Sequence, residues 1–183
     1  PADSGADAIK IAEPGDADDG RRGARYGFDF QNLHRNKRSL TLNLKAEEGK
    51  QIFLELAAKA DVIVENYRPD VKRRLGIDYE AVSAINPRII YGSISGFGQS
   101  GPYRDRPGYD QIAQGEAGLM SLTGLPGQGP VRVGIPIADL TAGIFLAQGI
   151  LLALYNREKT GQGQWVHTSR LAAPVARRAF PAP

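Results

Sequence analysis

Short apolar segments, typical of buried strands, alternate along this chain with segments of helical period. Three of them are DVIVE at 61–65, RIIYGSIS at 88–95 and GQWVHTS at 163–169. Just before the first, residues 46–60 carry apolar side chains at i, i+1, i+4 and i+5, the spacing of one helix face. This alternation predicts an α/β fold in which helices flank a parallel sheet, and the continuous apolar run of DVIVE predicts a strand buried on both faces.

The rest of the chain is organised around this core. Further strands are expected at 8–11 and 39–44, short helices over 69–76 and 78–87, longer helices over 109–122 and 137–158, and a loop over 20–36. Residues 1–169 are predicted to form an incomplete domain, because residues 1–11 are typical of a helix end that leads directly into a strand, with no earlier helix or strand in the sequence to complete it. The residues from 170 to 183, rich in alanine, arginine and proline, are expected to be an irregular tail.

Composition excludes several kinds of site. The chain has no cysteine and only two histidines, His34 and His167, so it has no disulfide scaffold, thiolate metal site or cysteine nucleophile, and we expect no metal. The net charge is +3 without a continuous basic stripe, so we expect a small anionic ligand and no nucleic acid. The most apolar run has 12 residues, fewer than the ~20 of a membrane span, and no signal-peptide pattern is present, so we expect a cytoplasmic protein without a membrane partner.

The segment GFGQSG at 96–101 matches the pattern G-x-G-x-x-G, which raises the alternative of an NAD or FAD enzyme. That pattern needs a helix directly behind the glycines, and Pro102 and Pro107 interrupt a helix there. The residue 20 positions after Gly96 is Glu116, which lies in a helical stretch and not at a strand end. We therefore interpret the segment as a flexible loop at the carboxyl end of a strand, where α/β proteins keep their sites.

Several charged residues have both a structural and a functional interpretation. Asp139, near the start of the long apolar helix, is expected to cap that helix or to be a carboxylate nucleophile toward an activated acyl group, and the two roles are compatible. The cations at 72–74 either complement the dipole of a short helix or bind phosphates beside a strand end. Tyr109 and Asp110 follow the flexible loop and are most simply the start of a helix.

Six motifs occur along the chain in a recognisable order and spacing. They are NKRS at 36–39, ADVIVEN at 60–66, INPR at 85–88, GYD at 108–110, GLMSLTG at 118–124 and TGQG at 160–163. With these motifs the chain, from about residue 6 to residue 169, closely resembles the family III CoA-transferases, the CaiB/BaiF group. The resemblance implies a Rossmann-like parallel sheet with flanking helices, the large domain of such an enzyme without its first strand and C-terminal half. For the whole protein it implies an interlocked homodimer.

The resemblance also implies roles for particular residues. Asp139 matches the catalytic aspartate of the family, and Tyr109 and Asp110 match positions that face the acyl pocket. The residues that match contacts with CoA are Leu42, Lys45, Asn66, Tyr67, Arg74 and Leu75, together with Arg104 or Arg106 from the loop before GYD.

The implied activity is transfer of CoA from an acyl-CoA donor to a small carboxylic acid, through an aspartyl mixed anhydride and an enzyme-CoA thioester. CoA is then a substrate, and no cofactor is permanently bound. One alternative is an α-methylacyl-CoA racemase, in which a histidine assists the aspartate. Tyr109 stands at the position of that histidine, and a neutral tyrosine is a poor base near pH 7. A second alternative is a catalytically inactive fragment, because the family's smaller domain and its glycine-rich active-site loop are absent from this sequence.

Overall fold

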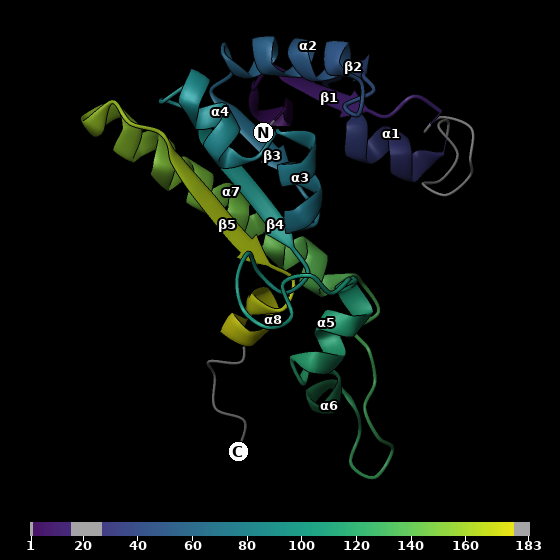
Figure 1. The fold of residues 1–183 in the computed structure, drawn as a ribbon. Helices are drawn as coiled ribbons and strands as arrows, with labels where there is room; N and C mark the ends of the chain where they lie inside the picture. The colour runs from purple at the N-terminus through teal and green to yellow at the C-terminus, as the bar shows by residue number, and fades with distance from the viewer. Residues whose placement is uncertain (1, 16–26, 178–183) are drawn as a thin grey trace. The chain divides into compact units, whose positions relative to one another are not determined.

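The computed structural model describes residues 2–15 and 27–177, which form two compact units (Figure 1). The first unit comprises the residues up to Glu55, and the second starts at Leu56. Each unit holds its own parallel sheet. The predicted α/β fold with parallel strands and flanking helices is confirmed, with the strands divided between two sheets.

The first unit is built on two parallel strands. Its elements are the 3-10 turn η1 (Ala2–Ser4), β1 (Ala8–Ala12), α1 (Phe28–His34), β2 (Lys37–Thr41) and most of α2 (Glu47–Ala57). The strands pair from Ala8 opposite Lys37 to Ala12 opposite Thr41. Both strands and the amphipathic helix of this part were expected from the sequence.

Helix α1 lies where the sequence predicts a loop over 20–36, part of which is outside the described residues. Phe30 and His34 are one turn apart, and their rings meet edge to face with centroids 4.4 Å apart. After the helix, Asn36 has a φ of 58°, a left-handed conformation that asparagine tolerates, and its side chain donates to the carboxylate of Asp3 at 2.9 Å. A ring pair and a distant carboxylate thus stabilise a helix that the polar composition does not indicate.

The second unit carries a three-stranded parallel sheet in the order β3–β4–β5. Its elements are β3 (Val62–Glu65), α3 (Pro69–Leu75), α4 (Tyr79–Ile85), β4 (Ile90–Ser95), α5 (Asp110–Glu116), α6 (Leu119–Thr123), α7 (Ile137–Thr160), β5 (Gln164–Ser169) and α8 (Ala172–Arg177). In β4 and β5 the register runs from Ile90 opposite Gln164 to Ser95 opposite Ser169. All three strands therefore end at the same edge of the sheet, which places the residues after them close together.

Helix starts and stops in this unit follow local sequence signals. Pro69 is the first residue of α3, and Gly76 ends that helix in a left-handed conformation with φ 66°. Asp78 caps α4 by accepting a hydrogen bond from the backbone N–H of Ala81 at 3.0 Å. Gly161, with φ 73°, ends α7.

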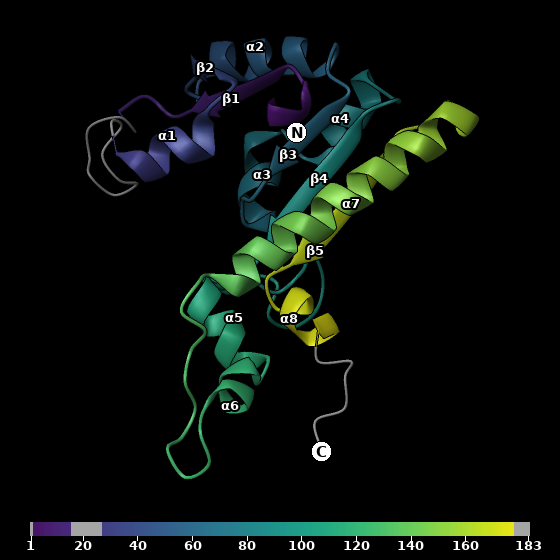
Figure 2. The ribbon, with the colours of Figure 1, turned by 180° about the vertical axis from the view of Figure 1, so that it is seen from behind.

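The side chains of β4 alternate between the two faces of the sheet. Gly92 faces α7, because a Cβ placed there would lie 3.1 Å from Cδ1 of Ile150 and 3.4 Å from Cδ1 of Leu146. Figure 2 shows α7 lying along this face of the sheet. Tyr91 faces the opposite side, where its hydroxyl donates to the carbonyl of Ile77, between α3 and α4, at 2.6 Å. The central strand is thus buried between two helical layers, and this holds its carboxyl end in a fixed position.

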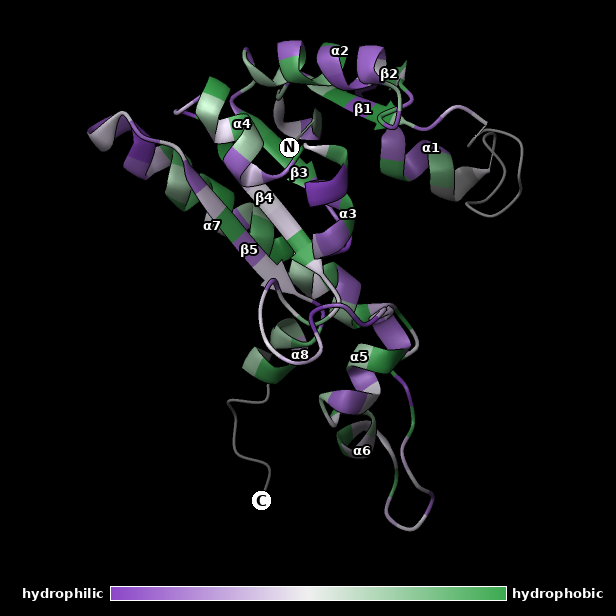
Figure 3. Ribbon diagram, viewed as in Figure 1, coloured by the Kyte–Doolittle hydropathy of each residue, from purple (hydrophilic) through white to green (hydrophobic). Residues whose placement is uncertain are grey.

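Helix α7 is long and apolar, as its green colour in Figure 3 shows, and one of its faces stays exposed. It contacts β4, β5, α5 and α8, whereas Leu151, Leu152 and Tyr155 are 67%, 63% and 64% exposed. By length and composition alone it is the one helix in the described part of the chain that could cross a bilayer, which the 12-residue apolar run does not indicate. Core helices that pack on a sheet pass the same test, so this is weak evidence for a membrane span.

Two expectations for secondary structure are corrected. The single helix predicted over 109–122 is two helices, α5 and α6, because Gly118 between them takes a left-handed φ of 73°. The strand DVIVE is not buried on both faces, because Val64 in β3 is 60% exposed.

The segment from residue 170, predicted to be an irregular tail, begins instead with the short helix α8. Ala173 and Pro174 are buried there, and α8 contacts α7 and β5. Packing against these elements supplies the order that the composition does not predict. The remaining part of the predicted tail, 178–183, lies outside the described residues.

Candidate functional site

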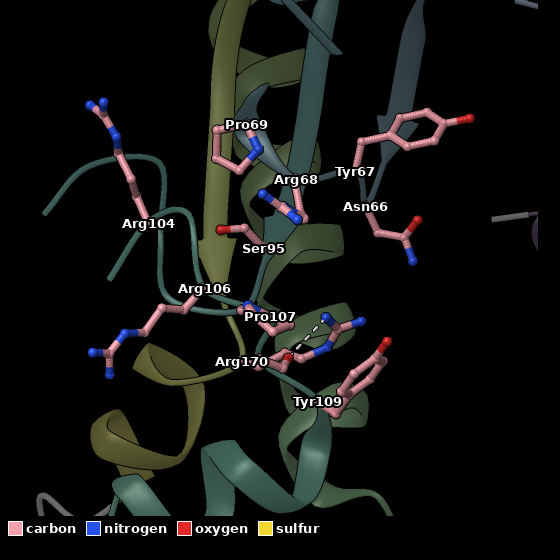
Figure 4. A pocket seen from close by; sticks show the side chains of 12 residues that line it. Asn66, Tyr67, Arg68, Pro69, Ser95, Arg104, Arg106, Pro107, Tyr109 and Arg170 are labelled. Carbon is pink, nitrogen blue, oxygen red and sulfur yellow. Dashed lines mark hydrogen bonds between the residues drawn. The ribbon is translucent and has the colours of Figure 1, made fainter. Parts of the chain in front are cut away.

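A shallow pocket of about 220 Å³ lies at the carboxyl edge of the β3–β4–β5 sheet (Figure 4). Residues that directly follow each strand contribute to it: Asn66 and Tyr67 after β3, Gly96 after β4, and Arg170 after β5. The rest of the lining consists of Arg68, Pro69, Ser95, Arg104, Arg106, Pro107, Gly108 and Tyr109. Because ligands of parallel α/β sheets bind at this edge, the pocket is the candidate functional site of the second unit.

Two glycines allow the loop after β4 to pass close beneath the pocket. A Cβ on Gly96 would lie 2.7 Å from Cα of Gly108, and a Cβ on Gly108 would lie 2.6 Å from Cα of Gly96, so neither position accepts a side chain without a shift of the backbone. Between the end of β4 at Ser95 and the start of α5 at Asp110 the chain forms no α-helix. The G-x-G-x-x-G segment therefore has no helix behind it for a pyrophosphate, and its first glycine serves a crossing of two backbone segments.

The pocket has a cationic rim. Arg104 is paired with Asp105 at 3.3 Å, and the guanidinium of Arg106 lies over the ring of Tyr103, 4.0 Å from its centroid. In Figure 4 these two arginines extend on the side of the pocket opposite to Tyr67 and Tyr109. Tyr109 is 72% exposed, so its ring stands open to a ligand.

Asp139 lies in the first turn of α7, and its carboxylate is held by Arg170. The Nε of Arg170 donates to Oδ1 of Asp139, and Nη1 donates to the carbonyl of Gly108 at 3.2 Å. The predicted cap role of Asp139 is wrong, because Pro136 occupies the cap position and no side-chain cap bond forms there. Its carboxylate is 43% exposed at the positive end of a helix, next to an arginine that lines the pocket.

Asp110 provides the cap that Asp139 does not. Its Oδ1 accepts hydrogen bonds from the backbone N–H groups of Ala138 at 2.8 Å and Asp139 at 3.2 Å. Its Oδ2 accepts from Nε2 of Gln114 at 2.6 Å, and Oε1 of Gln114 accepts from the N–H of Val133 at 2.9 Å. Asp110 and Gln114 are buried, so this pair fixes the segment that leads into α7 and the backbone that carries Asp139.

A buried polar network fixes the other side of the pocket. Nζ of Lys72 lies 2.8 Å from Oε1 of Glu65 and 3.1 Å from Oγ of Ser93, and Nε1 of Trp165 donates to the same Oγ at 2.9 Å. The second carboxylate oxygen of Glu65 accepts from the N–H of Tyr67 at 2.8 Å. The hypothesis that Lys72 binds phosphate is therefore wrong, because its ammonium is buried and paired. The network instead fixes the turn that carries Tyr67 into the pocket lining.

The structure brings together only part of the predicted CoA site. Asn66, Tyr67, Arg104 and Arg106 line the pocket with Tyr109. Arg74 and Leu75 lie in the last turn of α3 and are absent from the lining.

The two remaining predicted contacts belong to the first unit. Leu42 is buried there, and its N–H donates to the carbonyl of Ala12 at 2.9 Å. Lys45 forms an ion pair with Glu13 at 2.7 Å. Their roles in CoA binding stay predictions.

Arg170 is the site residue that the sequence analysis missed, since it was assigned to the tail. One signal was available: it directly follows a predicted strand, and the carboxyl ends of parallel strands are where such folds place their sites. The roles of Glu65 and Gln114 have no comparable sequence signal. In the described ranges, 2–15 and 27–177, no three His, Asp or Glu side chains are arranged to hold a metal ion.

Comparison with known proteins places these features in a family. The profile of CoA-transferase family III matches residues 2–180. The chain is 47% identical to acetyl-CoA:oxalate CoA-transferase of Acetobacter aceti, over 95% of this chain and 46% of that protein. It is 44% identical to formyl-CoA:oxalate CoA-transferase of Streptomyces avermitilis, over 90% of this chain and 41% of the other.

A solved structure agrees with the sequence comparison. The crystal structure of a CaiB/BaiF family protein from Brucella suis superposes with a TM-score of 0.83 at 36% identity, covering 94% of this chain and 48% of that one. The chain thus spans about half the length of the relatives it matches. Because the family profile extends over nearly all of the sequence and the fold agrees, the chain belongs to CoA-transferase family III.

Proposed function

We propose that the protein transfers CoA from an acyl-CoA donor to a carboxylic acid, with Asp139 as the nucleophile. The observation that carries this proposal is the position of Asp139: its carboxylate lies in the first turn of α7 and is bonded to an arginine of the pocket lining. A carboxylate is a sufficient nucleophile toward an activated acyl group. The N-terminus of a helix stabilises the negative charge that Asp139 regains when its carboxylate is released at the end of the reaction.

The reaction runs through four exchanges at one carboxylate. The Asp139 carboxylate attacks the thioester carbonyl of the donor and expels CoA thiolate, which forms a mixed anhydride. The thiolate attacks the Asp139 carbonyl of this anhydride, releases the donor acid and leaves CoA on Asp139 as a thioester. The acceptor carboxylate attacks that thioester and expels CoA thiolate, giving a second anhydride. The thiolate then attacks the acceptor carbonyl, which yields the new acyl-CoA and restores the Asp139 carboxylate.

The residues around Asp139 position this chemistry. Asp110 binds the backbone N–H of Asp139 and so fixes where the carboxylate starts. A nucleophile held within a few tenths of an ångström of its attack position avoids the entropic cost of finding it. We propose that Tyr109 faces the acyl group, as its exposed ring beside Asp110 would allow. We also propose that Asp110 contacts the substrate; in the structure both of its carboxylate oxygens accept hydrogen bonds from within the protein.

CoA carries phosphates, and the cationic rim is the part of the pocket suited to them. Arg104 and Arg106 are both exposed, and guanidinium groups bind phosphate through paired N–H donors. We propose Asn66 and Tyr67 as further contacts, and retain Arg74, Leu75, Leu42 and Lys45 as proposed contacts in the whole protein.

Relatives suggest the substrate class. Those described above are named for acetyl-CoA or formyl-CoA and oxalate, so a small acid is the proposed acceptor. We propose that the whole protein is a cytoplasmic enzyme that forms an interlocked homodimer and binds no membrane. The racemase alternative gains no support from the pocket, whose lining includes no histidine.

The test is the replacement of Asp139 by Asn in the whole protein, which keeps the size of the side chain and removes the nucleophile. Transfer from acetyl-CoA to oxalate is expected to fall at least about 1,000-fold, the order of loss seen when a catalytic nucleophile is removed. Binding of CoA should be retained. Turnover close to that of the unchanged protein would overturn the proposal.

A further inference from the structure

We propose that Arg170 is the binding group for the carboxylate of the acceptor acid, and that it becomes available when Asp139 loses its charge. This rests on the proposed function and names a residue that alternates between two partners in the same site. Before reaction the guanidinium is bonded to Asp139; after CoA has been loaded, it binds the incoming acid.

The position of Arg170 is fixed by its backbone and by one side-chain bond. Its N–H donates to the carbonyl of Ser95 at 2.9 Å, which extends the pairing of β4 and β5 by one residue. Its Nη1 donates to the carbonyl of Gly108 at 3.2 Å. The guanidinium therefore keeps its place in the pocket lining even without its bond to Asp139.

The side chain of Arg170 is only 19% exposed, so its guanidinium needs an anionic or polar partner at each stage. Nε is bonded to Asp139, Nη1 to Gly108, and Nη2 donates to no other residue in the described ranges. Arginine presents its donors as a planar fork that matches a carboxylate. One fork edge is thus available to an acid as soon as the Asp139 carboxylate is consumed.

Charge changes at Asp139 supply the timing. The free carboxylate is an anion, whereas an anhydride or a thioester of Asp139 is neutral. Formation of the enzyme-CoA thioester therefore removes the negative charge opposite Arg170 and leaves a poorly hydrated cation. An acceptor carboxylate that binds there replaces the lost ion pair and lies beside the carbonyl that it must attack. When CoA leaves with the acceptor, the carboxylate of Asp139 is restored and binds the guanidinium of Arg170 again.

Other cations of the pocket are less suited to this role. Arg68 is paired with Asp70 at 3.2 Å and Arg104 with Asp105 at 3.3 Å, and neither acid changes charge during the reaction. Arg106 lies over an aromatic ring. Arg170 is the one among these lining arginines that is bonded to the proposed nucleophile.

The experiment separates loading of CoA from its transfer to the acceptor. Arg170→Met and Arg170→Lys are made in the whole protein. Arg88→Met is the control, since Arg88 is an exposed arginine two residues before β4 and is absent from the pocket lining. Loading is measured as CoA bound covalently to the protein after addition of acetyl-CoA, formyl-CoA or succinyl-CoA alone. Transfer is measured as the KM for oxalate at saturating donor.

We expect Arg170→Met to load CoA within about threefold of the unchanged protein and to raise the KM for oxalate about 10- to 100-fold, the loss that removal of a charge-assisted hydrogen bond gives. Arg170→Lys should fall between, because it keeps the charge and loses the fork, and Arg88→Met should change neither quantity. Millimolar guanidinium ion added to an Arg170→Gly variant should lower the KM for oxalate again.

The results that contradict the inference are distinct from those that contradict the proposed function. Normal loading with an unchanged KM for oxalate in Arg170→Met overturns the role of Arg170 alone. Slow loading with an unchanged KM for oxalate also overturns it, because it makes Arg170 a restraint on Asp139 only. Absence of covalent CoA in the unchanged protein with all three donors overturns the proposed function and this inference with it.

Discussion

Replacement of Asp110 tests how the protein fixes the start of α7. Oδ1 accepts the N–H groups of Ala138 and Asp139 at 2.8 and 3.2 Å, and Oδ2 accepts Nε2 of Gln114 at 2.6 Å. Loss of a helix cap costs about 1–2 kcal/mol, and a buried amide left without its acceptor costs about 1–3 kcal/mol. Because these bonds share one carboxylate, we expect Asp110→Ala to lower the free energy of unfolding by about 2–4 kcal/mol.

A matched cap elsewhere gives the control. Asp78 caps α4 through a single bond to the N–H of Ala81 at 3.0 Å, so Asp78→Ala should cost about 0.5–2 kcal/mol. Asp110→Asn keeps one acceptor oxygen and should lie between the two. Urea denaturation measures the three variants, and hydrogen exchange of the amides at 138 and 139 should accelerate in Asp110→Ala and not in Asp78→Ala. Equal cost for both alanine variants, with unchanged exchange at 138 and 139, would refute the reasoning.

Three further predictions follow from burial, close backbone contact and a displaced pKa. Lys72→Met should lower the free energy of unfolding by about 3–5 kcal/mol, because it leaves the buried carboxylate of Glu65 without its cationic partner. The double variant Lys72→Met with Glu65→Gln should recover most of this loss. A small effect of the single change would show that the pair is solvated. Gly96→Ala should lower the urea midpoint, because the added Cβ would collide with the backbone of Gly108, whereas Gly134→Ala, which has open space around it, should not. Equal midpoints for the two variants would contradict the close contact between the backbones of Gly96 and Gly108. Burial lowers the pKa of His34, so below about pH 6.5 the unfolded chain takes up a proton that the folded chain does not. Stability should therefore fall as the pH falls. His34→Gln should reduce the difference between urea midpoints measured at about pH 7.5 and at about pH 5.5.

Local signals in the sequence predict much of the second unit. The proline that begins α3, the glycine that follows this helix and Asp78 before α4 mark helix ends that the structure has. These signals act between neighbours in the chain, so they can be read without knowledge of the fold. The break between α5 and α6 also depends on a single residue, Gly118, but a glycine in a helical stretch does not indicate by itself that its φ is positive.

The site is less predictable because its interactions join distant segments. Asp139 can be placed near a helix start from sequence, but its cap comes from Asp110, 29 residues earlier. Lys72 has the same helix-end pattern as its basic neighbours, and only the packing of Glu65 and Ser93 makes it a buried partner. The ion pair that brings Arg170 to the nucleophile requires β5 to lie beside β4, which no short-range pattern contains.

The most direct measurement is the identification of the residue that carries the acyl or CoA group during turnover. The whole protein is mixed with a donor acyl-CoA in the presence of hydroxylamine, digested, and analysed by peptide mass spectrometry. We expect a hydroxamate on Asp139, in the peptide that begins α7, and none on Asp110, because both oxygens of the Asp110 carboxylate accept hydrogen bonds within the protein. Continued CoA transfer with no modification of Asp139, or with the label on another carboxylate, would contradict the claim that Asp139 is the nucleophile.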